Sequence, residues 1–251
     1  MDYSQFKNTL HELFGSLLEQ FKEQGEYGFN YESSKPISKI GYCTNLTPEM
    51  VDQAKVENVN LIVTHHDAWE FVYGMREICV RKLKEYDIGH FFVHLPLDYA
   101  EFGTCNSLLK EIGDVTIIQQ SHHHNGQSAI GMAELEQPVD FNELVKRFSD
   151  ILAEDSKAWQ FGGKKVKRIG MITGAGDRTD CLHSAKSQQC DVYITGEKSL
   201  YTVQYAKFIG MNLIVGSHTF TEIFGVKALA HKIKEAYPQL ELVYLPEEHL
   251  E

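Results

Sequence analysis

The chain has 251 residues, 43% of them hydrophobic and 24% charged, which is the composition of a folded globular protein rather than a disordered one. Its formal net charge of −11 argues against nucleic acid as a partner, because binding to a phosphate backbone depends on many lysine and arginine contacts. No apolar run has the length of a membrane span and no signal-peptide pattern is present, so we expect a cytoplasmic protein without a membrane partner. The five cysteines lack paired spacings, which predicts neither a disulfide framework nor a zinc finger.

Residues 2–24 carry apolar side chains at three- and four-residue spacing, which predicts an amphipathic helix. Residues 27–35 are polar and contain glycine, so we expect a loop there. A first repeat of strands and helices follows, in which Thr47 and Pro48 form a strong helix start. Its expected strands are 37–43, 60–64, 89–93 and 115–118, and its expected helices are 48–57, 75–86 and 105–112.

A second repeat has the same order of elements. Its expected strands are 166–173, 191–195, 212–215 and 241–244, and its expected helices are 178–189, 200–208 and 223–236. A connecting segment lies between the repeats. It consists of a polar, histidine-rich stretch at 119–127, an extended stretch at 128–135 and a helix at 141–152. We interpret this connecting segment as part of neither repeat core.

Strands that alternate with helices predict parallel pairing through right-handed crossovers. The pattern therefore predicts an α/β fold with two similar, duplicated three-layer domains, whose mostly parallel sheets face each other across a central cleft. We place the first repeat, with the N-terminal helix, in residues 1–124. The connecting segment and the second repeat then occupy residues 125–251.

Histidines and carboxylates recur at predicted strand ends in both repeats. His94 and Asp98 follow the strand at 89–93, and the same two kinds of residue return 124 residues later at the same spacing. Ligands of parallel α/β sheets bind at the carboxyl ends of the strands, so we expect these side chains to converge in one cleft. The candidate residues are His65, His66, His94, Asp98, His218 and Glu222.

Imidazole nitrogens and carboxylate oxygens together suit divalent ions of Zn, Fe, Mn, Co or Ni. Because a carboxylate can bridge two ions, we expect Asp98 and Glu222 to hold two metal ions per chain about 3.5–4 Å apart. The terminal ligands are then His65, His66 and His218. Water bound to such a centre loses a proton near neutral pH and becomes a nucleophile. The pattern therefore predicts a hydrolytic dinuclear metal centre.

Each of these residues also has a structural explanation. A histidine at a strand end is commonly a hydrogen-bonded structural residue. Adjacent histidines in an extended strand point to opposite faces, so His65 and His66 converge only if the strand has broken into a turn. His94 is interpreted as an outer partner of the ligands or as a proton carrier, since five ligands already suffice. The recurrence of the pattern favours the metal site.

Three further patterns are left open. His122, His123 and His124 can bind metal, but a polar linker without a nearby acid is typical of a solvated loop. Residues 173–177 form either a phosphate-cradling turn or a tight turn between a strand and a helix. Glu197 either lines the cleft or caps the next helix.

Five motifs in a fixed order resemble one family. They lie at residues 64–66, 94–98, 170–177, 191–197 and 216–222. Together they are similar to the dinuclear-metal proteins often labelled GTP cyclohydrolase I type 2 homologs, or NIF3-like proteins, over nearly the whole chain. The resemblance implies two similar α/β domains, a toroidal homohexamer and a di-metal site formed by the five ligands above. Asp67 departs from the family, which commonly has proline after the paired histidines.

Two functional hypotheses follow. The first is a metal-dependent hydrolase that acts on a nucleotide-like small molecule, with purine ring opening of GTP as the case implied by the resemblance and phosphoester cleavage as a variant. The second is a non-catalytic metal-binding or regulatory assembly. For the assembly, we expect the N-terminal helix and the connecting segment to contact other copies, since a repeat pair does not need either to complete its core.

Overall fold

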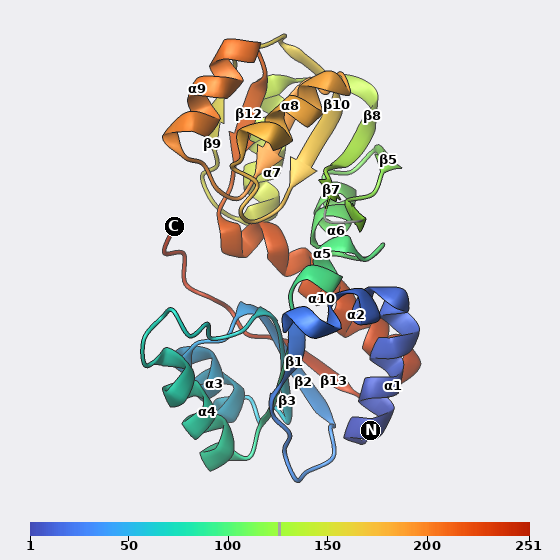
Figure 1. Cartoon of the computed structure of the whole chain (residues 1–251), viewed down its shortest axis with the longest axis vertical. Coiled ribbons are helices and arrows are strands. Elements are labelled where there is room, and N and C mark those ends of the chain that lie inside the picture. Colours follow the sequence, from blue (N-terminus) through green and yellow to red (C-terminus); the bar gives the residue numbers. More distant parts are fainter. Residues whose placement is uncertain (125–126) are drawn as a thin grey trace. The chain divides into compact units, whose positions relative to one another are not determined.

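We describe a computed structural model of the chain, which covers residues 1–251 apart from residues 125–126. The chain forms two compact units (Figure 1). The first unit comprises Met1–Phe102 and Val226–Leu250, and the second comprises Gly103–Gly225 with Glu251. The domain boundary expected between residues 124 and 125 lies at residues 125–126, which the structure does not describe. The two compact units divide the chain after Phe102 and after Gly225.

The first unit contains a five-stranded sheet in the order β1-β4-β3-β2-β13. Four of its strands are parallel, and β1 pairs antiparallel with β4. The strands are β1 (Tyr27–Tyr31), β2 (Lys39–Asn45), β3 (Leu61–His66), β4 (Gly89–Val93) and β13 (Glu241–Tyr244). The helices are α1 (Tyr3–Phe14), α2 (Ser16–Phe21), η1 (Lys22–Gln24), α3 (Pro48–Val56), α4 (Met75–Tyr86), α5 (Leu95–Tyr99) and the part of α10 (His218–Ala236) that follows Gly225.

Helices α3 and α4 pack together against one face of this sheet, in a core that contains Cys43, Val51, Ile62 and Leu83. The predicted start of α3 is confirmed, because the Thr47 side chain accepts a hydrogen bond from the backbone N–H of Met50.

The predicted N-terminal helix is broken at Gly15, whose φ of +54° ends α1 before α2 begins. The apolar face of α1 is covered by other residues of the same chain. Phe6 is fully buried, and its ring centroid lies 5.4 Å from that of Phe91 and 5.8 Å from that of Phe29. That face is therefore not available for contacts with other copies.

The second unit contains a six-stranded sheet in the order β5-β8-β10-β11-β12-β9. Its strands are β5 (Val115–Gln119), β8 (Gly131–Asp140), β9 (Lys157–Trp159), β10 (Lys165–Ile172), β11 (Val192–Thr195) and β12 (Asn212–Val215). Its helices are α6 (Thr104–Glu111), α7 (Phe141–Leu152), α8 (Thr179–Ser187) and α9 (Leu200–Ile209), and the first residues of α10 complete it. A separate ribbon pairs β6 (His122–His124) with β7 (Gln127–Ala129).

Neighbouring residues of β11 face opposite layers, as expected for a sheet that is covered on both sides. Val192 and Ile194 join the core under α6 and α7 with Phe148, whereas Tyr193 joins the core under α8 and α9 with Leu182. The three-layer α/β architecture predicted from the repeat is confirmed.

The duplication is visible in the pairing of strands. β2, β3 and β4 are parallel neighbours in the first sheet, and β10, β11 and β12 are parallel neighbours in the second. An antiparallel strand then pairs with the last strand of each trio: β1 pairs with β4 in the first sheet, and β9 pairs with β12 in the second. The expected loop at residues 27–35 therefore contains a strand that belongs to the repeated unit.

Two expectations about the sheets are wrong. The last strand of each predicted repeat joins the other unit: β5 pairs antiparallel with β8, and β13 pairs in parallel with β2. The connecting segment belongs to the second core, because β8 pairs with β10 and α7 buries Phe141, Leu144 and Phe148. Antiparallel pairs around β8 and β9 also make the second sheet mixed.

Among the helices of the described residues, none combines the length and the apolar character that a membrane span requires.

Candidate metal centre

The first histidine group comprises His65, His66, His94 and Asp98, all at the carboxyl ends of β3 and β4 in the first unit. The ring centroids of the three histidines are 4.6 Å, 5.0 Å and 5.3 Å apart. One ligand atom from each histidine lies within 4.8 Å of the other two, so the three side chains can hold a metal ion. Asp98, on the short helix α5, places Oδ1 3.3 Å from His65 Nε2.

The two adjacent histidines converge although both lie within β3. The expectation that the strand must first break into a turn is therefore wrong. His65 is fully buried and His66 is 7% exposed, so neither imidazole is a solvated surface group. Burial of two polar rings side by side is costly unless each ring has partners that satisfy its nitrogens.

Each histidine of this group has its Nδ1 atom beside an oxygen acceptor. His65 Nδ1 donates to the backbone carbonyl of Val93 at 3.0 Å. His66 Nδ1 donates to the side-chain oxygen of Asn45 at 2.7 Å. His94 Nδ1 lies 2.6 Å from Glu26 Oε2. A neutral imidazole that donates from Nδ1 carries its lone pair on Nε2, which is the form that binds a metal ion.

The Asn45 amide is oriented by a residue near the end of the chain. Its Nδ2 donates to Glu247 Oε1 at 2.8 Å, which leaves its oxygen to accept from His66. Glu247 also accepts from the backbone N–H groups of Thr44 and Asn45. Burial raises the pKa of Glu247, against the lowering effect of these hydrogen bonds. The sequence patterns did not indicate Asn45, Glu26 or Glu247, although Asn45 lies two residues after the strand predicted at 37–43 and ends the observed β2.

A second buried network lies behind the paired histidines. Thr64 Oγ1 donates to the backbone carbonyl of His66 at 2.6 Å and accepts from His90 Nε2 at 2.9 Å. His90 Nδ1 then accepts from Asn30 Nδ2 at 3.0 Å. Burial, with a smaller contribution from the positive charge of Arg76, lowers the pKa of His90 to about 3. His90 is therefore neutral in the folded protein at physiological pH.

Asp67 belongs to this second network and not to the histidine group. It is 5% exposed and accepts hydrogen bonds from the backbone N–H of Ala68 and from Asn30. The Arg76 guanidinium lies 3.6 Å from its other oxygen. Asp67 thus anchors the chain after β3.

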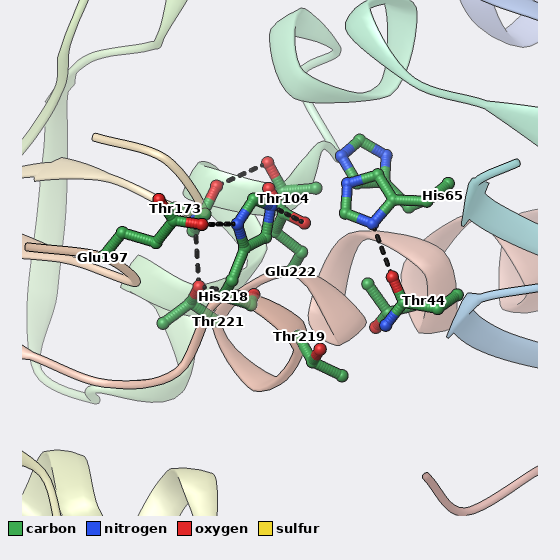
Figure 2. A network of polar contacts seen from close by, with 12 residues as sticks. Thr44, His65, Thr104, Thr173, Glu197, His218, Thr219, Thr221 and Glu222 are labelled. Carbon is green, nitrogen blue, oxygen red and sulfur yellow. Dashed lines mark hydrogen bonds and ion pairs between the residues drawn. The ribbon is translucent and has the colours of Figure 1, made fainter. Parts of the chain in front are cut away.

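The second histidine group comprises His218, Glu222 and Glu197 in the second unit (Figure 2). His218 and Glu222 lie four residues apart at the start of α10, and His218 Nε2 is 3.2 Å from Glu222 Oε2. Helix α10 starts five residues before the predicted helix at 223–236, which places both side chains on one helical face. His218 Nδ1 lies 2.5 Å from Glu197 Oε1. Glu197 therefore orients His218, and Ser199 caps the next helix instead.

The two carboxylates control the protonation of His218. Burial alone lowers its pKa, but hydrogen bonds and charge attraction from Glu222 and Glu197 outweigh burial and raise the pKa to about 9. Without a metal ion, His218 is therefore protonated at neutral pH. A metal ion on its Nε2 has to displace that proton.

Gly174 explains part of the glycine-rich run at residues 173–177. It has a φ of +59°, and a Cβ atom at this position would collide with the Glu222 carboxylate and lie 2.8 Å from His218 Nε2. The backbone N–H of Gly174 also donates to Thr221 Oγ1 at 3.0 Å. The run is therefore a tight turn after β10 that packs against the second histidine group.

The three adjacent histidines at residues 122–124 lie on strand β6, not in the expected loop, and His122 is exposed.

The fold and these side chains define a duplicated α/β protein with histidine and carboxylate groups that can bind a metal ion. The chain belongs to the Duf34/NIF3 (NGG1p interacting factor 3) family, whose sequence profile matches residues 1–249. The family resemblance stated from the five motifs is thus confirmed.

Individual relatives agree with this assignment. A protein from Pyrococcus horikoshii named GTP cyclohydrolase 1 type 2 homolog is 26% identical over 243 residues, which is 94% of this chain and 95% of that protein. A protein of the same name from Haemophilus influenzae is 27% identical over 218 residues, or 84% of this chain and 85% of that protein.

Solved structures share the fold. TTHA1606 from Thermus thermophilus has a TM-score of 0.83 at 21% identity and covers all of both chains. Reduced HcgD from Methanocaldococcus jannaschii has a TM-score of 0.79 at 17% identity and covers 98% of both chains.

Proposed function

We propose that the chain is a metal-dependent hydrolase with a dinuclear centre, and that its substrate is a nucleotide-like small molecule. The ligands in this proposal are His65, His66, Asp98, His218 and Glu222. The metal ions are two divalent ions per chain, of Zn, Fe, Mn, Co or Ni.

One observation carries the metal proposal. Four histidines, two of them buried, each place Nδ1 against an oxygen acceptor, which leaves Nε2 for a metal ion, in His218 after the proton it carries in the metal-free protein is displaced. For His65 and His218, that Nε2 atom faces a carboxylate at 3.3 Å and 3.2 Å. A purely structural histidine needs one such partner, whereas a set of oriented imidazoles beside carboxylates supports metal coordination.

A bound divalent ion lowers the pKa of water toward neutrality and so supplies a hydroxide nucleophile. The protein's own contribution is to orient the ligands and to manage protons beside them. His94 suits proton transfer, because it is partly exposed and its Nδ1 is held by Glu26 at 2.6 Å. Its position also allows it to be a third ligand beside His65 and His66.

The choice of substrate rests on the names of the relatives. Because these proteins are named GTP cyclohydrolase 1 type 2 homolog, GTP is the first substrate to test, with opening of the purine ring as the reaction. Phosphoester cleavage is the second reaction, since a hydroxide nucleophile serves both.

The test combines metal analysis with turnover. Protein purified without chelator should contain two metal ions per chain, and an Asp98→Ala, Glu222→Ala double variant should lose most of them. A screen over GTP, other nucleotides and phosphoesters should give turnover that disappears with chelator and returns with metal. Stoichiometry far below two metal ions after metal addition would contradict the centre. Full metal binding without turnover would instead support the non-catalytic metal-binding assembly.

We also propose that the chain forms the toroidal homohexamer that the family resemblance implies. Its contacts cannot use the apolar face of α1, because Phe6 and Leu10 are buried within the chain. Light scattering should give about six times the 28.6 kDa mass of one chain. A monomer at micromolar concentration would rule out the ring.

A further inference from the structure

The segment between β3 and α4 exposes large apolar side chains directly after the paired histidines. We call residues 69–73 the aromatic loop. Phe71 is 73% exposed, Val72 40% and Tyr73 96%, while Trp69 is partly buried. Three aromatic residues in five, with two of them facing solvent, are unusual for a surface loop, where an exposed apolar cluster commonly marks a binding site.

Trp69 joins this loop to the first histidine group. Its ring centroid lies 5.5 Å from that of His94, at 67° between the ring planes, and 6.3 Å from that of His66. On the loop side, Phe71 lies nearly parallel to Trp69, with centroids 6.4 Å apart and 12° between the planes. The aromatic surface therefore runs without interruption from the candidate metal ligands to solvent.

Residues outside the aromatic loop hold it in place. Asp67 accepts from the backbone N–H of Ala68 at 2.7 Å, and Arg76 joins Asp67 to Glu70 through contacts of 3.6 Å and 3.2 Å. The rings of Trp69 and Phe92 also pack in a T-shaped arrangement, with centroids 6.0 Å apart. Anchors at both ends hold the aromatic side chains beside the histidines, which lowers the ordering cost of binding.

We propose that the aromatic loop is a stacking platform for a planar heterocyclic ring of the substrate, and that Trp69 and Phe71 are its binding residues. Flat aromatic surfaces bind bases by stacking, which tolerates different ring substituents. Because Trp69 contacts His66 and His94, a ring on this platform lies beside the candidate metal ligands. The inference rests on the proposed function and assigns the recognition of the ring to this loop.

Binding of the ring can be measured without metal or turnover. The chain has two tryptophans, so a Trp159→Phe variant leaves Trp69 as the only indole. We expect guanosine and GTP to quench Trp69 fluorescence in chelator-treated protein, while ribose 5-phosphate, which has no base, does not. In this background Phe71→Ala should weaken guanosine binding about tenfold or more. Phe208→Ala is the matched control, because Phe208 is 84% exposed on α9 in the other unit.

Several results would overturn the platform. Equal quenching by ribose 5-phosphate and guanosine would do so, as would equal guanosine affinity in the Phe71→Ala and Phe208→Ala variants. A Phe71→Ala variant with altered molar mass in light scattering but unchanged guanosine affinity would show that the loop contacts another copy of the chain instead. If Phe71→Ala fails to fold by circular dichroism, Phe71→Leu retains an apolar side chain without the stacking ring and takes its place.

The outcome is independent of catalysis. Base-dependent quenching without any turnover would retain the platform and reject the hydrolase. Turnover with no base-dependent quenching would retain the hydrolase and reject the platform.

Discussion

The two buried histidines of the first group and His218 of the second are all oriented through Nδ1, but by acceptors of different charge. In the first group, the buried His65 and His66 donate to a carbonyl and an amide, which are neutral. In the second group, His218 lies between two carboxylates, and its pKa is raised to about 9. Neutral acceptors orient an imidazole without favouring its protonation, whereas carboxylates stabilise a proton that a metal ion must displace. The comparison suggests that metal binding at the second group depends more strongly on pH.

The largest expected effect comes from crowding the second group. Gly174→Ala should lower Zn²⁺ affinity at least about a hundredfold, because the new Cβ atom collides with the Glu222 carboxylate. Glu222 is itself a proposed metal ligand, so its displacement should cost more affinity than the loss of a residue that only orients a ligand. Calorimetric titration of chelator-treated protein measures this. Gly210→Ala is the control, since Gly210 has nearly the same φ, +60°, but its Cβ would meet only Phe161 O at 3.6 Å. Equal losses in both variants would show that backbone strain, and not the collision, is responsible.

Acid should destabilise the first unit through His90. Its pKa is about 3 in the folded protein and about 6.5 when unfolded, so its stabilising contribution is complete above pH 6.5 and is lost as the pH falls toward 3. Between pH 7 and pH 4.5 the free energy of unfolding should fall by roughly 2 to 3 kcal/mol from this group. Denaturant titrations can follow Trp69 in the first unit and Trp159 in the second through single-tryptophan variants.

A His90→Gln variant provides the reference for that prediction. Glutamine does not titrate, so the additional loss of stability below pH 6.5 should disappear from the Trp69 signal and leave the Trp159 signal unchanged. An identical pH dependence in wild type and variant would contradict the assignment to His90.

Removing the neutral acceptor in the first group should have a smaller effect. Asn45→Ala leaves His66 Nδ1 without its 2.7 Å partner, and loss of such an outer partner costs about 10- to 100-fold in metal affinity. The expected pH dependence of Zn²⁺ binding stays unchanged, because no charge is removed. A changed pH dependence would mean that Asn45 affects more than orientation.

The smallest expected effect concerns charge at the second group. Glu197→Gln keeps an oxygen beside His218 Nδ1 but removes a negative charge, so the pKa of His218 should fall from about 9 by roughly one unit. NMR titration of the imidazole resonances in metal-free protein measures this shift. Glu26→Gln, next to His94 in the other group, should leave His218 unchanged and serves as the control.

Local sequence patterns predicted the repeated cores well. The strands at 89–93, 212–215 and 241–244 and the helices at 75–86 and 141–152 have the predicted bounds, because uniform apolar or amphipathic runs end at clear turn residues. β1 was missed because Gly28 and Asn30 interrupt it, although the aromatic residues at 27, 29 and 31 alternate as in a strand.

Pairing over long distances could not be predicted in the same way. Nothing within residues 241–244 indicates that they pair with β2, since any apolar strand fits either sheet. The acceptors of His65 and His94 are a backbone carbonyl and a glutamate outside the repeated motifs. Residue type and spacing identified candidate ligands, whereas their orientation depends on tertiary contacts.

The placement of β13 has a consequence for the order in which the protein is made. A ribosome completes Gly103–Gly225, which is all of the second unit except Glu251, before β13 exists, so this segment can fold while the first sheet still lacks the strand that pairs with β2. Glu247, which orients Asn45 and through it His66, is synthesised later still. Domains commonly fold as units during synthesis, and contacts between distant residues form slowly. We therefore expect the emerging chain to present an ordered second histidine group first, and the N-terminal unit to mature last.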